Sequence, residues 1–205
     1  MGFFSSADDA THFPAVSGRR IDGTDVELPR DLPADATLLV VAFRDDLDPV
    51  SDQWAALGER IASAHDGRVA VWETPVVDHK MKLLGGLATV GIRGELDDAR
   101  ERERTVVLYV DKTVFRKTLG IKTSEVVAFL VHRDGEIVWR GEDTIEMDEI
   151  TGLEAAVADV LAAPRAAVTD DVAPEESADD ADADAGALGP DERETAPRPP
   201  DEMTD

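Results

Sequence analysis

Cysteine is absent from this 205-residue chain. Its absence excludes disulfide bonds, thiolate metal ligands and every mechanism that uses a cysteine nucleophile. Long apolar runs are missing too: the longest, residues 38–43, falls far short of the roughly 20 residues of a membrane-spanning helix. The N-terminus has no charged leader and no cleavage site. The sequence therefore predicts a cytoplasmic protein with no membrane insertion.

Lysine is also scarce, since only five of the 21 basic residues are lysine, and they face 45 acidic residues for a net charge of −24. A field of that sign repels nucleic acid and anionic membranes, so we expect neither as a partner. An acidic, lysine-poor composition is typical of a halophilic, salt-accumulating microbe, in which concentrated salt screens the self-repulsion. An ordinary acidic protein from a GC-rich genome is the alternative.

The C-terminal part of the chain has little with which to build a core. From residue 166 onwards, fourteen acids and two arginines accompany almost no large apolar side chain. Such a segment buries too little surface to offset its ordering entropy. We therefore expect an N-terminal arm (1–12), one domain (13–163) and a disordered acidic tail (164–205).

Apolar patterning within the domain predicts alternating strands and helices. A weak hairpin at 19–28 is followed by strands at 37–43, 68–73, 105–110, 126–131 and 137–139, and by helices at about 50–64, 78–90, 112–119 and 150–160. Pro75 is expected to end the second of these strands, and Asp134-Gly135 to form a tight turn. The order predicts an α/β fold: a mixed sheet with helices on both faces, closed by a C-terminal β-hairpin and a helix.

Two stretches of the sequence carry a family resemblance. LGIKTSEVVAFLVHRDGEIVWRG (119–141) resembles the strand, Asp-Gly turn and strand of the thioredoxin-like superfamily, in its peroxiredoxin-type branch. With GIRGELDDARERERTVVLYVDKTVFRKTLGI (91–121), it is similar to cysteine-free relatives of the mitochondrial ATP synthase assembly factor family. The resemblance spans roughly residues 12–160 and implies a thioredoxin-like fold.

The sequence departs from that superfamily at both of its redox features. Thioredoxin-like enzymes carry one or two cysteines between the first core strand and the next helix, whose positive end lowers the thiol pKa. Here that position reads RDDLDP (44–49), so Asp45, Asp46 and Asp48 occupy a vestigial active site. They are interpreted as a helix cap and acidic surface, with a site for a hard cation as the alternative. The cis-proline position, near 123–126, holds no proline.

One basic stretch stands out from the acidic background. Its members flank the predicted strand at 105–110: Arg93, Arg100, Arg102, Arg104, Lys112, Arg116 and Lys117. Arginine forms bidentate contacts with carboxylates. We therefore expect a binding surface for an anion or an acidic partner segment, formed by Arg93, Arg104, Lys112 and Arg116. Local ion pairing with Asp97, Asp98, Glu101 and Glu103 is the alternative.

Catalysis has few candidate side chains. Asp45, Asp48 and His79 are the only plausible ones. Asp78 and His79, with Glu73 nearby, could form an acid–base pair or part of a metal site, but a helix cap at Asp78 and a surface residue at His79 explain the same residues, and the four histidines show no metal-ligand spacing. We therefore expect no catalytic residue, no metal and no cofactor. The sequence favours a non-catalytic thioredoxin-like protein that binds another protein, in the assembly of a complex. A carboxylate- or histidine-based enzyme and an anion-binding module on the same scaffold remain alternatives.

Overall fold

The computed structural model describes residues 10–43, 49–82 and 99–163. The chain divides into two units, Met1–Arg165 and Ala166–Asp205, and every described residue belongs to the first. The predicted acidic tail (164–205) and most of the predicted arm lie outside the described residues, as does most of the helix expected at 78–90.

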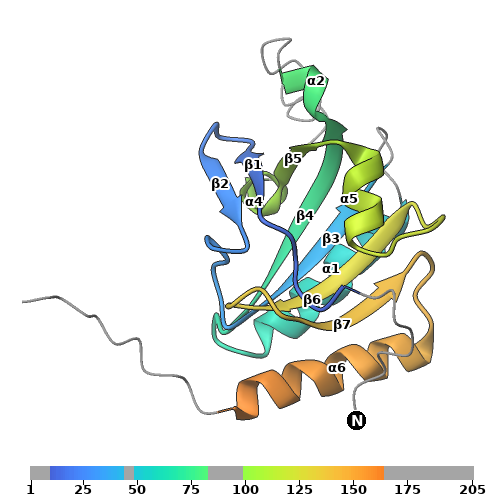
Figure 1. The fold of residues 1–205 in the computed structure, drawn as a ribbon. Coiled ribbons are helices and arrows are strands. Elements are labelled where there is room, and N and C mark those ends of the chain that lie inside the picture. The colour runs from blue at the N-terminus through green and yellow to red at the C-terminus, as the bar shows by residue number, and fades with distance from the viewer. Residues whose placement is uncertain (1–9, 44–48, 83–98, 164–205) are drawn as a thin grey trace, which may run out of the picture. The chain divides into compact units, whose positions relative to one another are not determined.

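A mixed sheet of seven strands, in the order β2-β1-β5-β4-β3-β6-β7, runs through the described residues (Figure 1). The strands are β1 (Val16–Arg20), β2 (Asp25–Leu28), β3 (Ala36–Ala42), β4 (Val69–Asp78), β5 (Val106–Val110), β6 (Val126–His132) and β7 (Ile137–Glu142). The three central strands β3, β4 and β5 are parallel, and every other pairing is antiparallel. The carboxyl ends of the parallel strands therefore meet at one edge of the sheet.

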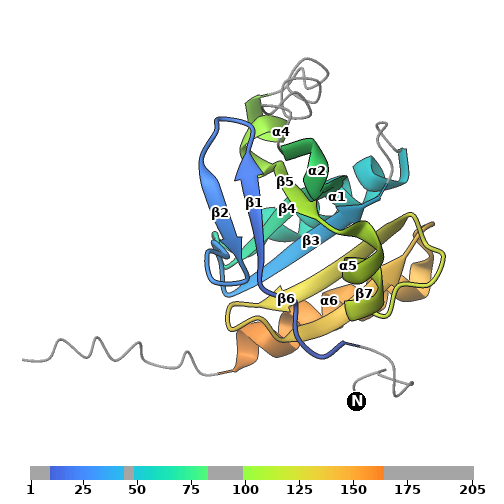
Figure 2. The ribbon, with the colours of Figure 1, turned by 45° about the horizontal axis from the view of Figure 1, so that its top comes forward.

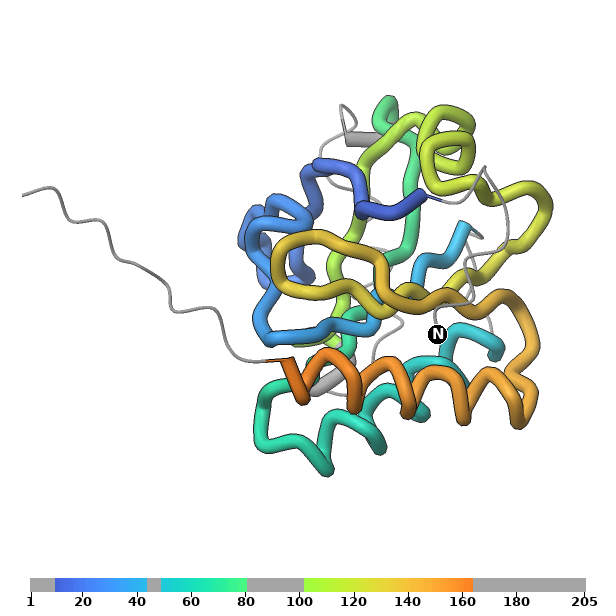
Figure 3. Tube along the Cα trace, turned by 60° about the horizontal axis from the view of Figure 1, so that its bottom comes forward, coloured from blue at the N-terminus to red at the C-terminus, as the bar shows by residue number. Residues whose placement is uncertain are grey.

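Helices cover both faces of the sheet, as the sequence predicts (Figures 2 and 3). On one face, α1 (Pro49–Ser63) and α6 (Met147–Ala162) pack against Leu38 and Val40 of β3. On the other, α5 (Lys112–Thr118) packs against Leu39 and Val41. Because β3 is covered on both sides, all its side chains are buried and all but Thr37 are apolar, without alternation. No helix within the described ranges is long and apolar enough to cross a membrane.

Strand β4 runs through Pro75, so the prediction that this proline ends the strand is wrong. Pro75 is the last β4 residue in register with β3, opposite Ala42. Continuous pairing with β5 begins one residue later, where Val76 lies opposite Leu108. The missing N–H of Pro75 thus falls where one ladder ends and the next begins, which a strand tolerates.

Helix α5 is held firmly at its start and along its inner face. The carboxylate of Asp111 accepts hydrogen bonds from the N–H groups of Thr113 (2.9 Å) and Val114 (3.0 Å), so Asp111 is the N-cap of the helix. Phe115 and Leu119 are buried in the core. Two short helices complete the described residues, α2 (His79–Lys82) and α4 (Ala99–Arg104), which lie after β4 and before β5.

Candidate functional site

The carboxyl edge of the parallel strands is where open α/β sheets usually bind ligands. At this edge the chain leaves β3 at Phe43, leaves β4 at Asp78 and leaves β5 for the Asp111 cap of α5. The resemblance places the missing thiol of this scaffold between β3 and α1. The residues of that junction, including Asp45, Asp46 and Asp48, lie outside the described ranges.

Two of the predicted binding residues meet at Phe43, the last residue before that junction. Lys112 Nζ donates a hydrogen bond to the Phe43 carbonyl at 3.0 Å. The guanidinium of Arg116 lies over the Phe43 ring, 3.9 Å from its centroid, a geometry that stabilises a cation on an aromatic face. Lys112 and Arg116 thus fasten the end of β3 to α5.

Arg116 also ties α5 to the segment that leads into β6. Its guanidinium donates to the carbonyl of Ser124 at 2.7 Å and to the carboxylate of Glu125 at 3.1 Å. The buried Ser124 hydroxyl in turn donates to Glu142 of β7. This segment is where the resemblance would place a cis-proline, and here side-chain bonds hold it instead.

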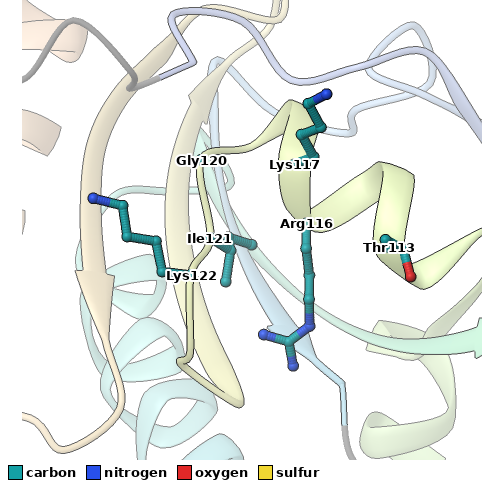
Figure 4. A pocket seen from close by; sticks show the side chains of 6 residues that line it. All are labelled: Thr113, Arg116, Lys117, Gly120, Ile121 and Lys122. Atoms are coloured by element: carbon teal, nitrogen blue, oxygen red, sulfur yellow. The ribbon is translucent and has the colours of Figure 1, made fainter.

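A hollow of about 530 Å³ runs along α5 and the loop that follows it (Figure 4). It is lined by Thr113, Arg116, Lys117, Gly120, Ile121 and Lys122. Lys117 and Lys122 are exposed, and neither has an acidic partner among the described residues. Lys117 belongs to the predicted basic stretch, whereas Lys122 was missed, because only the fold shows that its loop lies beside α5.

Arg104 lies at the opposite end of β5 and forms a different kind of contact. Its guanidinium pairs with Glu59 of α1 and Glu73 of β4. The Arg104 side chain is 16% exposed and that of Glu73 is 14% exposed. Partial burial acts to lower the pKa of Arg104, but the contacts with Glu73 and then Glu59 outweigh it and raise the pKa above its ordinary value.

The predicted binding residues therefore do not form one surface in the described structure. Lys112 and Arg116 lie together at the carboxyl edge, and Arg104 is enclosed by carboxylates at the other end of β5. The partners of Arg104 include acids distant in sequence, which the expectation of local pairing did not name. Arg93 lies outside the described residues.

The Asp78–His79 pair offers little for acid–base catalysis. The His79 ring lies 3.5 Å from the Asp78 carboxylate, and both side chains are about half exposed. A hydrogen bond from the Lys80 N–H, followed by the nearby charges of Lys80, His79 and Lys112, lowers the pKa of Asp78. A general acid needs the opposite shift, so this arrangement suits a cap of α2. No three His, Asp or Glu side chains of the described residues form a metal-binding group.

Comparisons with known proteins identify the scaffold through its structure. No protein-family model matches the chain, and no curated protein matches its sequence. An uncharacterized thioredoxin-like protein from Porphyromonas gingivalis has a TM-score of 0.51 at 18% identity, over 75% of this chain and 94% of its own. Copper-bound ScoI from Arabidopsis thaliana has a TM-score of 0.50 at 15% identity, over 73% and 99%. The fold is thioredoxin-like.

The thioredoxin-like fold is thus shared, while the chemistry at its carboxyl edge is not that of a thiol enzyme. At these identities the likeness shows the architecture alone. The prediction of a mixed sheet with a C-terminal β-hairpin and helix is confirmed, because β6, β7 and α6 follow the parallel strands in that order. The function of this thioredoxin-like domain therefore has to be inferred from its own side chains and not from those of the structures it resembles.

Proposed function

We propose that this protein is a non-catalytic thioredoxin-like scaffold that binds another polypeptide through the outer face of α5. The observation that carries the proposal is a thioredoxin-like fold in a chain with no cysteine. Thiol–disulfide exchange and peroxide reduction by this scaffold need a thiolate. The four methionines of the chain supply none. Binding uses the same scaffold without needing a thiol.

The α5 face, defined as Thr113, Val114 and Lys117 together with Lys122 of the next loop, supports the proposal. Val114 is 60% exposed, and the only other exposed large apolar side chain among the described residues is Met147, at 76%. The inner face of α5 is anchored by buried Phe115 and Leu119. An anchored helix that presents an apolar side chain one turn from a lysine, with a second lysine in the next loop, needs little ordering to bind a partner.

Assembly of a protein complex is the role that this proposal favours. It draws support from the resemblance of residues 91–141 to cysteine-free relatives of the mitochondrial ATP synthase assembly factor family, in the peroxiredoxin-type branch. The net charge of −24 argues against nucleic acid as the partner. The alternative of a carboxylate- or histidine-based enzyme receives no support from the lowered pKa of Asp78.

Affinity capture from native cells at their own salt concentration tests the proposal, with a matched pair of variants. Val114→Asp places a charge on the α5 face, and Met147→Asp places the same charge on the other exposed apolar side chain, in the first turn of α6. Both sites are exposed, so we expect both variants to fold. Val114→Asp should recover about tenfold less partner, identified by mass spectrometry, while Met147→Asp recovers the wild-type amount. Loss in Met147→Asp alone would move the surface to α6 and overturn the proposal.

A further inference from the structure

The two lysines of the α5 face differ from most of the basic residues that the structure describes. Arginines of the described residues commonly pair with carboxylates, as in Arg19–Asp25 and Arg60–Glu154. Lys117 and Lys122 are exposed, have no such partner in the described ranges, and line one hollow. In a chain with 45 acids and 21 bases, two exposed lysines on one hollow with no carboxylate partner among the described residues are a local exception.

We propose that the α5 face recognises an extended acidic segment of the partner polypeptide. This inference rests on the proposed binding function and narrows it to one chemical class. Complementary charge selects the partner and fixes its register. Lys117, in the last turn of α5, also suits the negative end of the helix. Lys122 lies beyond the helix and has no such role, so the helix dipole does not account for the pair.

The geometry of the hollow favours an extended ligand over a compact anion. Figure 4 shows that the side chains of Arg116, Lys117 and Lys122 point in different directions. A phosphate-sized ion needs donors that converge on one point, whereas successive carboxylates of a peptide can reach diverging cations. Arg116 is already bonded to Ser124 and Glu125, so its role is to position the helix and loop.

The lining of the hollow also has an apolar part. Ile121 lines the hollow but is only 5% exposed, whereas Val114 is 60% exposed. Val114 lies one helical turn before Lys117, so Val114 and Lys117 share the outer face of α5. An acidic segment that carries one apolar side chain fits this lining better than a uniform polyanion. The bound peptide would place its carboxylates near the two lysines and its apolar residue near Val114.

A peptide titration on the full-length protein tests the inference. The probe is a fluorescein-labelled ten-residue peptide of glutamates with one central leucine, measured by anisotropy in 1 M KCl. At that salt the Debye length is about 3 Å, so the net charge of the protein contributes little and direct contacts dominate. The wild type should bind, and the double variant Lys117→Glu, Lys122→Glu should bind at least about tenfold more weakly.

The matched control changes net charge equally at other exposed sites. Arg30→Glu, Arg60→Glu removes cations that are 75% and 64% exposed and lie outside α5. We expect wild-type affinity for this variant. An equal loss in the control would attribute binding to overall charge and overturn the inference. Displacement of the peptide by millimolar inorganic phosphate would overturn it too, because that result indicates a compact anion site.

The two proposals fail in distinguishable ways. If Val114→Asp abolishes partner capture but the acidic peptide does not bind the wild type, the proposed binding of a polypeptide is supported and its specificity for acidic segments is contradicted. If the peptide does not bind and Val114→Asp captures as much partner as the wild type, both proposals are contradicted. Peptide binding that depends on Lys117 and Lys122 but not on Arg30 and Arg60 supports the acidic specificity.

Discussion

The two ends of β5 carry basic residues that look alike in the sequence and have different roles in the structure. At the amino end, Arg104 is enclosed by Glu59 and Glu73 and joins the end of α4, just before β5, to α1 and β4. At the carboxyl end, Lys112 and Arg116 hold Phe43, and beyond them Lys117 and Lys122 remain exposed. A cluster of cations in an acidic chain is therefore not one feature: some of these cations are paired with carboxylates, and others are exposed without a carboxylate partner among the described residues.

The difference arises from partners that are distant along the chain. Glu59 and Glu73 are 45 and 31 residues from Arg104, and only the packing of α1 on β4 brings them to it. No acidic residue of the described structure is brought to Lys117 or Lys122 in the same way. The fold thus decides which cations are neutralised, and substitutions at the two ends of β5 should separate the two roles.

Replacing Arg104 should have the largest effect on stability. Arg104→Ala leaves Glu59 and Glu73 close together without their shared cation, and Glu73 is largely buried. We expect a loss of about 2–3 kcal/mol in the free energy of unfolding, below the value for a fully buried pair because Glu59 is partly exposed. Denaturant unfolding measures it. Arg104→Lys keeps the positive charge but lacks the planar guanidinium that contacts Glu59 and Glu73 together. Its free energy of unfolding should therefore lie between those of the wild type and Arg104→Ala. A change within about 0.5 kcal/mol for Arg104→Ala would show that the cluster is not stabilising.

Replacing Arg116 should have an intermediate effect. Arg116→Ala removes the contact with the Phe43 ring and the hydrogen bond to the Ser124 carbonyl. These contacts together predict a loss of about 1–2 kcal/mol. Arg116→Lys retains a cation near Phe43 and should recover part of the loss. If both variants unfold like the wild type, Arg116 does not hold the loop, and the positioning role assigned to it is wrong.

The smallest effect is expected at Asp78, and it depends on pH. The Lys80 N–H lowers the pKa of Asp78 below its ordinary value of 3.8. The folded state therefore binds this proton less tightly than the unfolded state. The resulting stabilisation is present above pH 3.8 and is lost as the pH falls toward the lower, folded-state pKa. As the pH is lowered from 4.5 to 2.5, the free energy of unfolding should therefore decrease less for Asp78→Asn than for the wild type. If the free energies of unfolding of the two proteins decrease equally over this pH range, the lowered pKa of Asp78 is contradicted.

Much of the fold follows from local signals in the sequence. The apolar run of β3 predicts a strand covered on both faces, Asp134-Gly135 predicts the β6–β7 hairpin, and Asp111 predicts the start of α5. Each depends on the backbone preferences or burial of a few neighbouring residues. Pro75 shows the limit of such signals, because its tolerance within β4 depends on where the pairings with β3 and β5 begin and end.

The site was only partly predictable for a related reason. Lys112 and Arg116 were identified as functional candidates from charge alone, yet nothing in the sequence indicates that both contact Phe43. Lys122 was not identified, since its position beside α5 depends on the path of the loop into β6. Local charge patterns show which residues are unusual, whereas tertiary packing decides which of them are already paired.

The most direct test compares Arg104→Ala with the double variant Lys117→Glu, Lys122→Glu in two assays in 1 M KCl: free energy of unfolding and affinity for the acidic peptide. Arg104→Ala should lose about 2–3 kcal/mol of stability and bind the peptide like the wild type. The double variant should unfold within about 0.5 kcal/mol of the wild type and bind at least about tenfold more weakly. If both variants lose stability and both retain peptide affinity, the cations at the two ends of β5 share one structural role, and the assignment of the α5 face as a binding surface is contradicted.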